Sequence, residues 1–314
     1  MKLQQLRYLT EIARRGLNVS EAAEALHTSQ PGVSKQIRAL EDELGIDVFV
    51  RHGKRLVSVT EPGKAVIAIA ERILAEAGNL KRAGEEFAND KLGTLTIAAT
   101  HTQARYALPK AVAAFKRRYP QVELHIHQGN PTQICDQVVA GEADLCVATE
   151  MIDRYPELVS LPVYQWNRCV VAPPKHPLLK ETPLTLEGLA QYPIVTYDFA
   201  FANRSLVQKA FETRGLKPQI VLSAQDSDVI KTYVELGLGV GILAKMAFDP
   251  ARDRALRAID ASHLFESSTT RLGIKRGAYL RRYAYDFIEA FAPQLPRSIV
   301  ERVVLGEEGS RYEL

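Results

Sequence analysis

Hydrogen-bond donors are concentrated in one short stretch of this chain, residues 28–38, which contains no acidic side chain. Hydroxyl, amide and basic side chains at helical spacing are the groups that donate to the base edges and phosphate oxygens of DNA. Val33 and Ile37 recur on the opposite side, which predicts an amphipathic helix with one buried face. The residues that we assign to DNA binding in this stretch are Ser29, Gln30, Pro31, Ser34, Lys35 and Arg38.

Two helices joined by a tight turn are expected to position these donors. Residues 20–26 form a first helix with a small apolar face. Ser29 is a good N-cap for the second helix, and Pro31 falls in its first turn, where a missing backbone N–H costs nothing. A further helix is predicted over residues 3–13. This order is typical of a helix-turn-helix, although an ordinary helical hairpin with a solvated face is the alternative.

A basic turn between two short apolar segments favours the helix-turn-helix over the ordinary helical hairpin. Residues 49–57 predict a strand, a tight turn at Gly53 and a second strand. The basic side chains of this hairpin are placed to lie against the phosphate backbone of DNA or in a minor groove. These further DNA-binding candidates are Arg51, Lys54 and Arg55. Three helices and a basic wing together favour an all-α winged helix-turn-helix domain over residues 1–60.

A long amphipathic helix follows, over residues 61–92. Thr60 is its expected N-cap, and apolar residues then recur at helical spacing to Phe87. Such a helix must bury its apolar stripe, and we expect a second copy of the same helix to cover it, with packing on its own domain as the alternative. The stripe residues that we assign to dimerisation are Val66, Ile69, Ile73 and Leu80.

Strands and helices alternate from residue 93 to residue 296, which predicts an α/β domain with mainly parallel sheets. The order of the segments suggests two lobes. Lobe I covers about 93–163 and 268–296, and lobe II covers about 164–267. Two crossings of the chain between the lobes leave a cleft, and residues 297–314 are expected to be a tail.

Polar residues placed directly after strands are the candidates for a ligand site in that cleft. Ligands of open α/β sheets lie at the carboxyl ends of strands, near the N–H groups of helix N-termini, which attract anions. The residues selected by this rule in lobe I are Thr100, Thr102, Gln103 and Thr149. Ala202, Asn203 and Arg204 open a helix across the cleft, where they are placed to close over the ligand. The alternative is that each threonine only caps a helix.

The remaining patterns argue against other classes of protein. No apolar run approaches the ~20 residues of a membrane span, and the N-terminus lacks the apolar core of a signal peptide, so we expect a cytoplasmic protein without membrane contact. The three cysteines form no metal or redox pattern. His125 and His127 share a strand face but have no third ligand within reach, and Gly237 to Gly241 precedes a strand rather than a helix. We therefore expect no metal, no cofactor and no enzymatic activity.

Longer strings of residues resemble one family. Residues 1–60 resemble the winged helix-turn-helix of LysR-type transcriptional regulators, and the resemblance continues to about residue 296. It is most specific for the members that control sulfur assimilation and cysteine synthesis. The matching strings are THTQARY (100–106), YQWNRC (164–169), DVIKTY (228–233), LGLGVG (236–241) and DASHLFESS (260–268). Such members carry a threonine at the position of Ala202, which lacks the hydroxyl.

The resemblance implies a homotetrameric activator that binds double-stranded promoter DNA and RNA polymerase. It implies a two-lobed effector domain similar to type 2 periplasmic binding proteins, with sulfate, thiosulfate or an acetylserine in the cleft. Regulation of sulfonate use or by another small acid is the alternative within the family. A solute-binding protein is the alternative of another class, and the DNA module argues against it.

Overall fold

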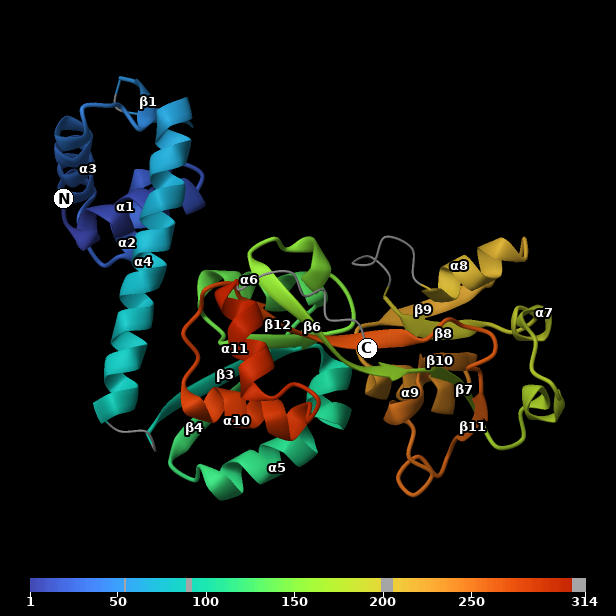
Figure 1. The fold of residues 1–314 in the computed structure, drawn as a ribbon. Coiled ribbons are helices and arrows are strands. Elements are labelled where there is room, and N and C mark those ends of the chain that lie inside the picture. Colours follow the sequence, from blue (N-terminus) through green and yellow to red (C-terminus); the bar gives the residue numbers. More distant parts are fainter. Residues whose placement is uncertain (54, 89–91, 199–205, 307–314) are drawn as a thin grey trace. The chain divides into compact units, whose positions relative to one another are not determined.

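The computed structural model describes residues 1–53, 55–88, 92–198 and 206–306 (Figure 1). The chain divides into two compact units, Met1–Phe87 and Ala88–Leu314. Each unit has its own core, so each is described by itself. In the part of the chain that the structure describes, no helix combines the length and the apolar character that crossing a bilayer requires.

The N-terminal unit contains the expected helices and hairpin. Its elements are α1 (Leu3–Arg14), α2 (Val19–Ala25), α3 (Gln30–Leu44), β1 (Phe49–His52), β2 (Arg55–Val59) and α4 (Glu61–Ala88). Leu9, Ile12, Val33, Leu40 and Phe49 are almost fully buried in one core shared by the helices and the hairpin. The apolar positions at helical spacing therefore face that core, as the sequence predicted. The two strands are antiparallel, so they form the predicted wing.

Helix α4 divides its apolar stripe between two environments. Ala70 is buried in the core of the N-terminal unit, and Val66 and Ile73 pack against that core from outside. In contrast, 46% of Ile69 and 76% of Leu80 are exposed. The first half of the helix thus packs on its own domain, which was the alternative interpretation of the stripe. Of the four stripe residues assigned to dimerisation, Ile69 and Leu80 are the ones exposed enough to contact another chain.

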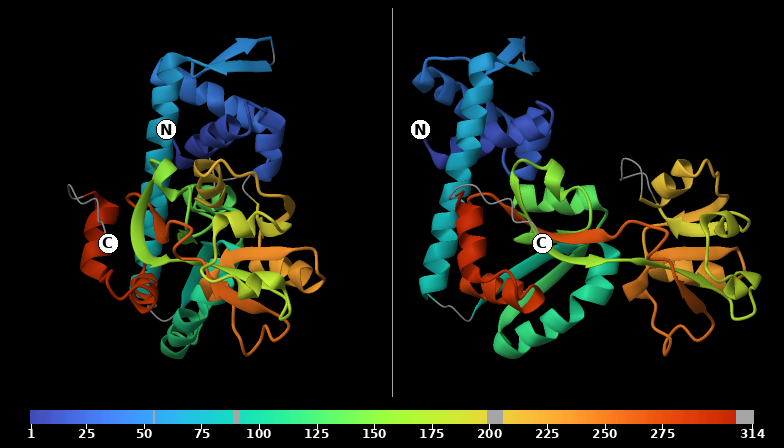
Figure 2. Two further views of the ribbon diagram at one scale, coloured as in Figure 1. Left: turned by 90° about the vertical axis from the view of Figure 1, so that its right-hand side faces the viewer. Right: turned by 45° about the vertical axis from the view of Figure 1, so that its right-hand side comes forward.

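The C-terminal unit contains two five-stranded sheets, one in each lobe (Figure 2). The order in lobe I is β4-β3-β5-β12-β6, and the order in lobe II is β11-β7-β10-β8-β9. The strands of lobe I are β3 (Gly93–Ala99), β4 (Val122–Gln128), β5 (Leu145–Ala148), β6 (Leu158–Trp166) and β12 (Ser268–Lys275). The strands of lobe II are β7 (Arg168–Ala172), β8 (Ile194–Tyr197), β9 (Ile220–Ala224), β10 (Val240–Ala244) and β11 (Arg257–Asp260).

Helices cover both faces of each sheet. Helices α5, α10 and α11 pack on one face of lobe I and α6 on the other, while α7 and α8 pack opposite α9 in lobe II. The helices of lobe I are α5 (Pro109–Arg118), α6 (Pro131–Ala140), α10 (Arg282–Phe291) and α11 (Arg297–Leu305). The helices of lobe II are α7 (Leu186–Leu189), α8 (Leu206–Thr213) and α9 (Ser227–Glu235). Short helical turns are η1 (Gln103–Ala107), η2 (Ile152–Arg154), η3 (Pro177–Lys180) and η4 (Lys245–Ala247).

Both sheets are mainly parallel, as predicted, because four strands of each sheet run in one direction and a single strand, β12 or β7, runs against them. Strand β12 is antiparallel to β5 and β6, and β7 is antiparallel to β10 and β11. The cause is the path of the chain between lobes: it leaves lobe I along β6 and returns along β12 in the opposite direction. The return of residues 268–275 to lobe I was predicted correctly.

The C-terminal segment is not a tail from residue 297, which corrects the expected boundary. Residues Arg297–Leu305 form α11, and Val300 and Val304 are buried in the core of lobe I. The spacing of these two valines by four residues is a helical signal that the sequence interpretation overlooked. The stretch from Gly237 to Gly241 packs closely against its neighbours, because a Cβ atom on Gly239 would lie 2.1 Å from the carbonyl oxygen of Pro193.

Candidate functional site

Helix α3 presents the predicted donors on an exposed face. Ser29 caps it, since its hydroxyl accepts the N–H of Gly32 at 3.3 Å. Gln30, Pro31, Lys35 and Arg38 are exposed, and Ser34 is half-buried. The amide of Gln30 donates to the hydroxyl of Ser34 at 3.1 Å, one turn further along the helix. The basic end of this face is therefore open to a polyanion, as major-groove binding requires.

The wing is anchored by a buried carboxylate that the sequence reasoning missed. Glu41 in α3 is 5% exposed and accepts the N–H groups of Val48 and Phe49 at 2.8 and 3.2 Å. The guanidinium of Arg51 pairs with the same carboxylate. Arg51 is therefore held within the protein, and it orients the wing rather than extending freely toward a phosphate. Arg55 is exposed, and Lys54 lies outside the described residues.

A cavity of about 280 Å³ lies in the C-terminal unit at the junction of the two lobes. Thr100, Thr102, Gln103 and Thr149 all line it, so the structure brings together the four residues chosen from lobe I. Other lining groups were not foreseen by sequence reasoning. Most come from strands and helices far apart in the chain, whereas His101 and Glu150 directly follow Thr100 and Thr149. The unforeseen lining groups include His101, Gln128, Asn130, Glu150, Trp166, Arg168, Tyr197 and Asp226. Asp198 also lines the cavity.

Two of the four predicted residues are already engaged in the protein. The amide of Gln103, which is 1% exposed, donates to the hydroxyl of Thr270 at 3.0 Å and accepts the hydroxyl of Tyr164. The hydroxyl of Thr102 lies 3.4 Å from that of Ser227 in lobe II. Both residues stand where β3 gives way to the π-helical turn η1, a local geometry that recurs at functional sites. They connect the cavity wall to both lobes.

A buried cation and a half-buried carboxyl group lie in the wall of the cavity. Arg168 is 6% exposed, and its guanidinium lies 5.0 Å from the ring centre of Trp166. Burial lowers the pKa of Arg168, whereas the nearby Glu150 opposes this change. Burial raises the pKa of Glu150, and the charges of Arg168 and Arg154 act against that increase. The cavity therefore holds a cation and a carboxyl group at reduced solvation.

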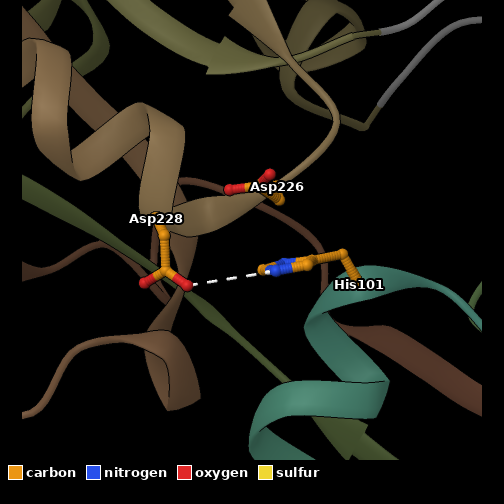
Figure 3. A group of neighbouring side chains, drawn as sticks. All are labelled: His101, Asp226 and Asp228. Atoms are coloured by element: carbon orange, nitrogen blue, oxygen red, sulfur yellow. Dashed lines mark ion pairs between the residues drawn. The ribbon is translucent and has the colours of Figure 1, made fainter. Parts of the chain in front are cut away.

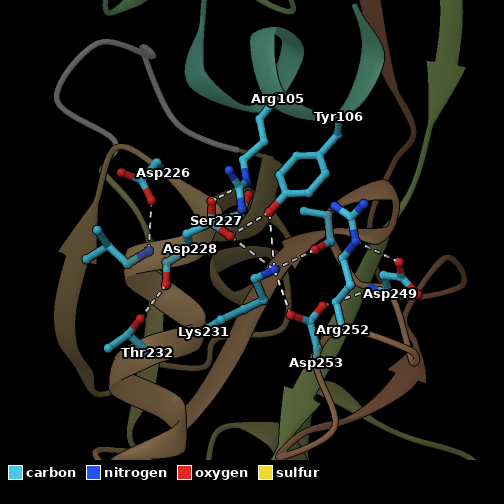
Figure 4. Close-up of polar contacts among 12 residues, drawn as sticks. Arg105, Tyr106, Asp226, Ser227, Asp228, Lys231, Thr232, Asp249, Arg252 and Asp253 are labelled. Carbon is cyan, nitrogen blue, oxygen red and sulfur yellow. Dashed lines mark hydrogen bonds and ion pairs between the residues drawn. The ribbon is translucent and has the colours of Figure 1, made fainter. Parts of the chain in front are cut away.

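A network of charged side chains joins the lobes beside the cavity (Figure 4). Asp228 in α9 accepts the hydroxyl of Tyr106 at 2.7 Å and pairs with Arg105, both from lobe I. Lys231 pairs with Asp228 at 3.1 Å and with Asp253 at 2.9 Å. These bonds hold the two lobes in one relative position within the C-terminal unit.

His101, Asp226 and Asp228 approach one another at the edge of this network (Figure 3). Their nearest ligating atoms lie within 4.8 Å, which is a possible metal-binding arrangement. However, Asp228 is already compensated by Arg105 and Lys231, and Asp226 caps α9 by accepting the N–H of Val229. The chemistry of this cluster therefore fits an ion-pair network better than a cation site. Ala202, Asn203 and Arg204 lie outside the described residues.

The fold and the two surfaces define a class of protein: a regulator in which a winged helix-turn-helix is followed by a two-lobed α/β domain with an internal cavity. The sequence matches the family of bacterial regulatory helix-turn-helix proteins of the lysR type over residues 3–64. It matches the LysR substrate binding domain over residues 88–296. The chain therefore belongs to the LysR family of bacterial transcriptional regulators, and the predicted fold class and family are confirmed.

Individual relatives show which members of the LysR family this chain is similar to. The HTH-type transcriptional regulator CysB of Burkholderia cenocepacia is 56% identical over 314 residues, which cover all of both chains. The regulator SsuR of the same organism is 54% identical over 94% of this chain and 96% of its own. The cofactor-binding domain of the Cbl transcriptional regulator has a similar structure, with a TM-score of 0.66 and 43% identity over 69% of this chain and 95% of that domain. The full-length relatives are regulators, so the solute-binding alternative finds no support.

Proposed function

We propose that this protein regulates genes of sulfur assimilation and cysteine synthesis, and that a small anion bound in the inter-lobe cavity controls it. The observation that carries the proposal is the convergence of Thr100, Thr102, Gln103 and Thr149 on one cavity that also contains the buried cation Arg168. Hydroxyls, an amide and a guanidinium are donors suited to oxyanions and carboxylates. The similarity to CysB and SsuR supports the sulfur assignment.

The DNA-binding half of the proposal rests on α3 and the wing. Lys35 and Arg38 are exposed on the face of α3 opposite Val33, so they are placed to read base edges in a promoter. Arg55 on the wing is placed to contact phosphates. RNA polymerase is the further partner that an activator at a promoter requires.

The assembly that we propose is a homo-oligomer, a dimer or tetramer, joined through the second half of α4. Leu80 and Phe87 are 76% and 89% exposed on that helix, which is unusual for large apolar side chains in a folded protein. A second copy of α4 would cover them. Val66 and Ile73 contribute less to this interface than expected, because they already pack on the core of their own unit.

A thermal-shift panel tests the ligand assignment. Sulfate, thiosulfate, O-acetylserine, N-acetylserine and alkanesulfonates are added separately to the full chain. A ligand that binds only the folded state stabilises it by about 2.7 kcal/mol at a hundred times its dissociation constant. A dominant response to an alkanesulfonate would instead favour control of sulfonate use.

Two variants locate the site in this panel. Thr102→Ala removes a cavity hydroxyl and should reduce the shift, because one neutral hydrogen bond contributes about 1 kcal/mol, or several-fold in affinity. Thr213→Ala removes an exposed hydroxyl from α8, outside this cavity, and should leave the shift unchanged. Equal shifts in the wild type and Thr102→Ala, or no shift with any anion, would contradict the proposal.

A further inference from the structure

We infer that the hydroxyl of Tyr106, held between Asp228 and Lys231, is a latch that keeps the two lobes closed and controls how fast a ligand enters and leaves the cavity. The latch consists of protein side chains alone, so it acts whether or not a ligand is bound. The kinetic part of the inference rests on the proposed function, because it takes the cavity as the effector site. The latch itself can be tested without any ligand.

The hydroxyl of Tyr106 bonds across the junction of the lobes. Tyr106 lies in η1 of lobe I, whereas Asp228 and Lys231 lie on α9 of lobe II. The hydroxyl donates to the carboxylate of Asp228 at 2.7 Å and accepts the ammonium group of Lys231 at 3.1 Å. Figure 4 shows the hydroxyl between these two charged groups. Hydrogen bonds to charged groups are stronger than neutral ones, so this contact should contribute substantially to lobe closure.

The ring of Tyr106 is also attached to lobe II. It packs against the buried cluster of lobe II that contains Ile230 and Val234 of α9. The ammonium nitrogen of Lys231 lies 5.4 Å from the centre of the ring, within the range of a cation–π contact. A residue of lobe I is therefore held by lobe II through both its ring and its hydroxyl. A phenylalanine would keep the packing of the ring, so the contribution of the hydroxyl can be tested by itself.

Two weaker contacts accompany the Tyr106 latch. Arg105 pairs with Asp228, but the side chain of Arg105 is 52% exposed, so water screens the pair. The hydroxyl of Thr102 lies 3.4 Å from that of Ser227, which is long for a hydrogen bond between hydroxyl groups. These contacts join the same part of lobe I to the start of α9. They assist the latch, whereas the Tyr106 hydroxyl has the better geometry and less exposure to water.

The latch lies on the same two segments as part of the cavity wall. Residues 100–103 line the cavity just before Tyr106, and Asp226 lines it just before Asp228. The chain itself passes between the lobes near residue 167 and over residues 261–267. Two lobes connected in this way separate by rotation about the connecting residues. Such a rotation would widen the cavity, and it requires the bonds of the Tyr106 hydroxyl to break.

A latch of this kind controls rates rather than affinity. Its bonds are the same in the free and the ligand-bound closed forms, so it stabilises both forms equally. Weakening the latch raises the open fraction of both forms by the same factor, and a ligand that needs the open form then enters and leaves faster by that factor. The dissociation constant is the ratio of these two rate constants. It stays unchanged, because an interaction that does not distinguish two states does not shift the equilibrium between them.

Tyr106→Phe tests the latch in two measurements on the full chain. In the first, acrylamide quenches the fluorescence of Trp166, which lines the cavity, without any ligand. We expect stronger quenching in the variant, because its lobes open more often. In the second, stopped-flow fluorescence follows the binding of O-acetylserine. We expect its association and dissociation rate constants to increase together by roughly tenfold, because losing a hydrogen bond to a charged group typically changes an equilibrium by that factor or more.

Two further variants make the result specific. Arg105→Gln removes the exposed contact with Asp228 and should raise quenching and both rate constants by a smaller factor. Its position on the surface keeps the test valid if Tyr106→Phe is poorly folded. Arg214→Gln is the matched control, because Arg214 is 64% exposed and pairs with Glu187 at 3.3 Å within lobe II. It should change neither quenching nor the rate constants.

The outcomes separate this inference from the proposed function. Unchanged quenching in Tyr106→Phe and Arg105→Gln would overturn the latch, and so would a change in affinity through the dissociation rate constant alone, because Tyr106 would then shape the cavity wall rather than hold the lobes. If O-acetylserine does not bind the wild type, the proposed control by this ligand fails. Stronger quenching in the two variants would still support the latch in that case.

Discussion

Replacing Lys231 by methionine should strongly destabilise the C-terminal unit. The side chain of Lys231 is 10% exposed and that of its partner Asp253 is 11% exposed, so the pair is shielded from water. Burial alone would lower the pKa of Lys231, but the bonds with Asp253, Tyr106 and Asp228 raise it above the ordinary value. The residue is therefore a permanent cation, bonded also to the carbonyl oxygen of Ala247 at 3.0 Å.

The expected loss of unfolding free energy follows from the groups that lose their partner when Lys231 is replaced. Methionine preserves most of the volume but leaves the carboxylate of Asp253 without its cation. Removing one partner of a buried ion pair typically costs about 3–5 kcal/mol. Asp253 keeps the backbone N–H of Asp249 at 2.8 Å, and Asp228 keeps Arg105, so we expect the lower end, about 3 kcal/mol. For a unit of this size, that loss corresponds to roughly 6–12 °C in Tm.

The assay is urea and thermal unfolding followed by the fluorescence of Trp166. It is the single tryptophan of the sequence and lies in the C-terminal unit, so its emission reports on that unit alone. The control is Lys209→Met, which breaks an exposed pair with Glu266 at 3.1 Å and should cost less than about 1 kcal/mol. Equal losses in the two variants, or a loss below about 1 kcal/mol for Lys231→Met, would refute the reasoning.

Other predictions concern DNA, assembly and pH. Lys35→Ala should cost about 1–3 kcal/mol in promoter binding and relax sequence preference, whereas Arg55→Ala should weaken all sequences alike and reduce the salt dependence, as measured by fluorescence anisotropy. Leu80→Glu should break the oligomer in light scattering without unfolding the chain, because Leu80 is 76% exposed, whereas Ile73→Glu should also lower the stability of the N-terminal unit. Burial alone would raise the pKa of Asp228, but Tyr106, Lys231 and Arg105 lower it. Asp228 therefore stabilises the folded state above the unfolded-state pKa of about 3.9, and this stabilisation is lost as the pH falls through the lower folded-state pKa. Asp228→Asn should therefore reduce the dependence of the unfolding free energy on pH in this acid range, as measured by urea unfolding at several pH values.

Local signals in the sequence predicted the elements well. Ser29 caps α3 because its hydroxyl needs only a backbone N–H three residues ahead, and such contacts are encoded over a few residues. Short apolar runs in the sequence likewise predicted that strands end just before Thr100 and Thr149. Because neighbouring parallel strands of one sheet end at the same edge, the rule for α/β sheets is sufficient to predict from the sequence that the cavity threonines lie together.

Features that depend on distant segments escaped the sequence reasoning. Arg168 begins a strand of lobe II, and no local sequence pattern distinguishes it from an exposed basic residue. Only the tertiary structure buries it beside Trp166. Glu41 has no local pattern that marks it as the anchor of the wing, because its partners are 7 to 10 residues further along and come together only in the tertiary structure. The antiparallel direction of β12 is likewise set by the return path between lobes, which periodicity does not encode.

The fluorescence of Trp166 offers the most direct test of the central claim, that a small anion in the inter-lobe cavity controls promoter binding. Trp166 lines that cavity and is the single tryptophan of the chain, so a ligand bound there should change its emission saturably. We expect O-acetylserine to change Trp166 emission with the same dissociation constant at which it alters the affinity for promoter DNA. Thr102→Ala should shift both constants together. An effector that alters DNA binding at concentrations that leave Trp166 emission unchanged would place the site elsewhere and contradict the account.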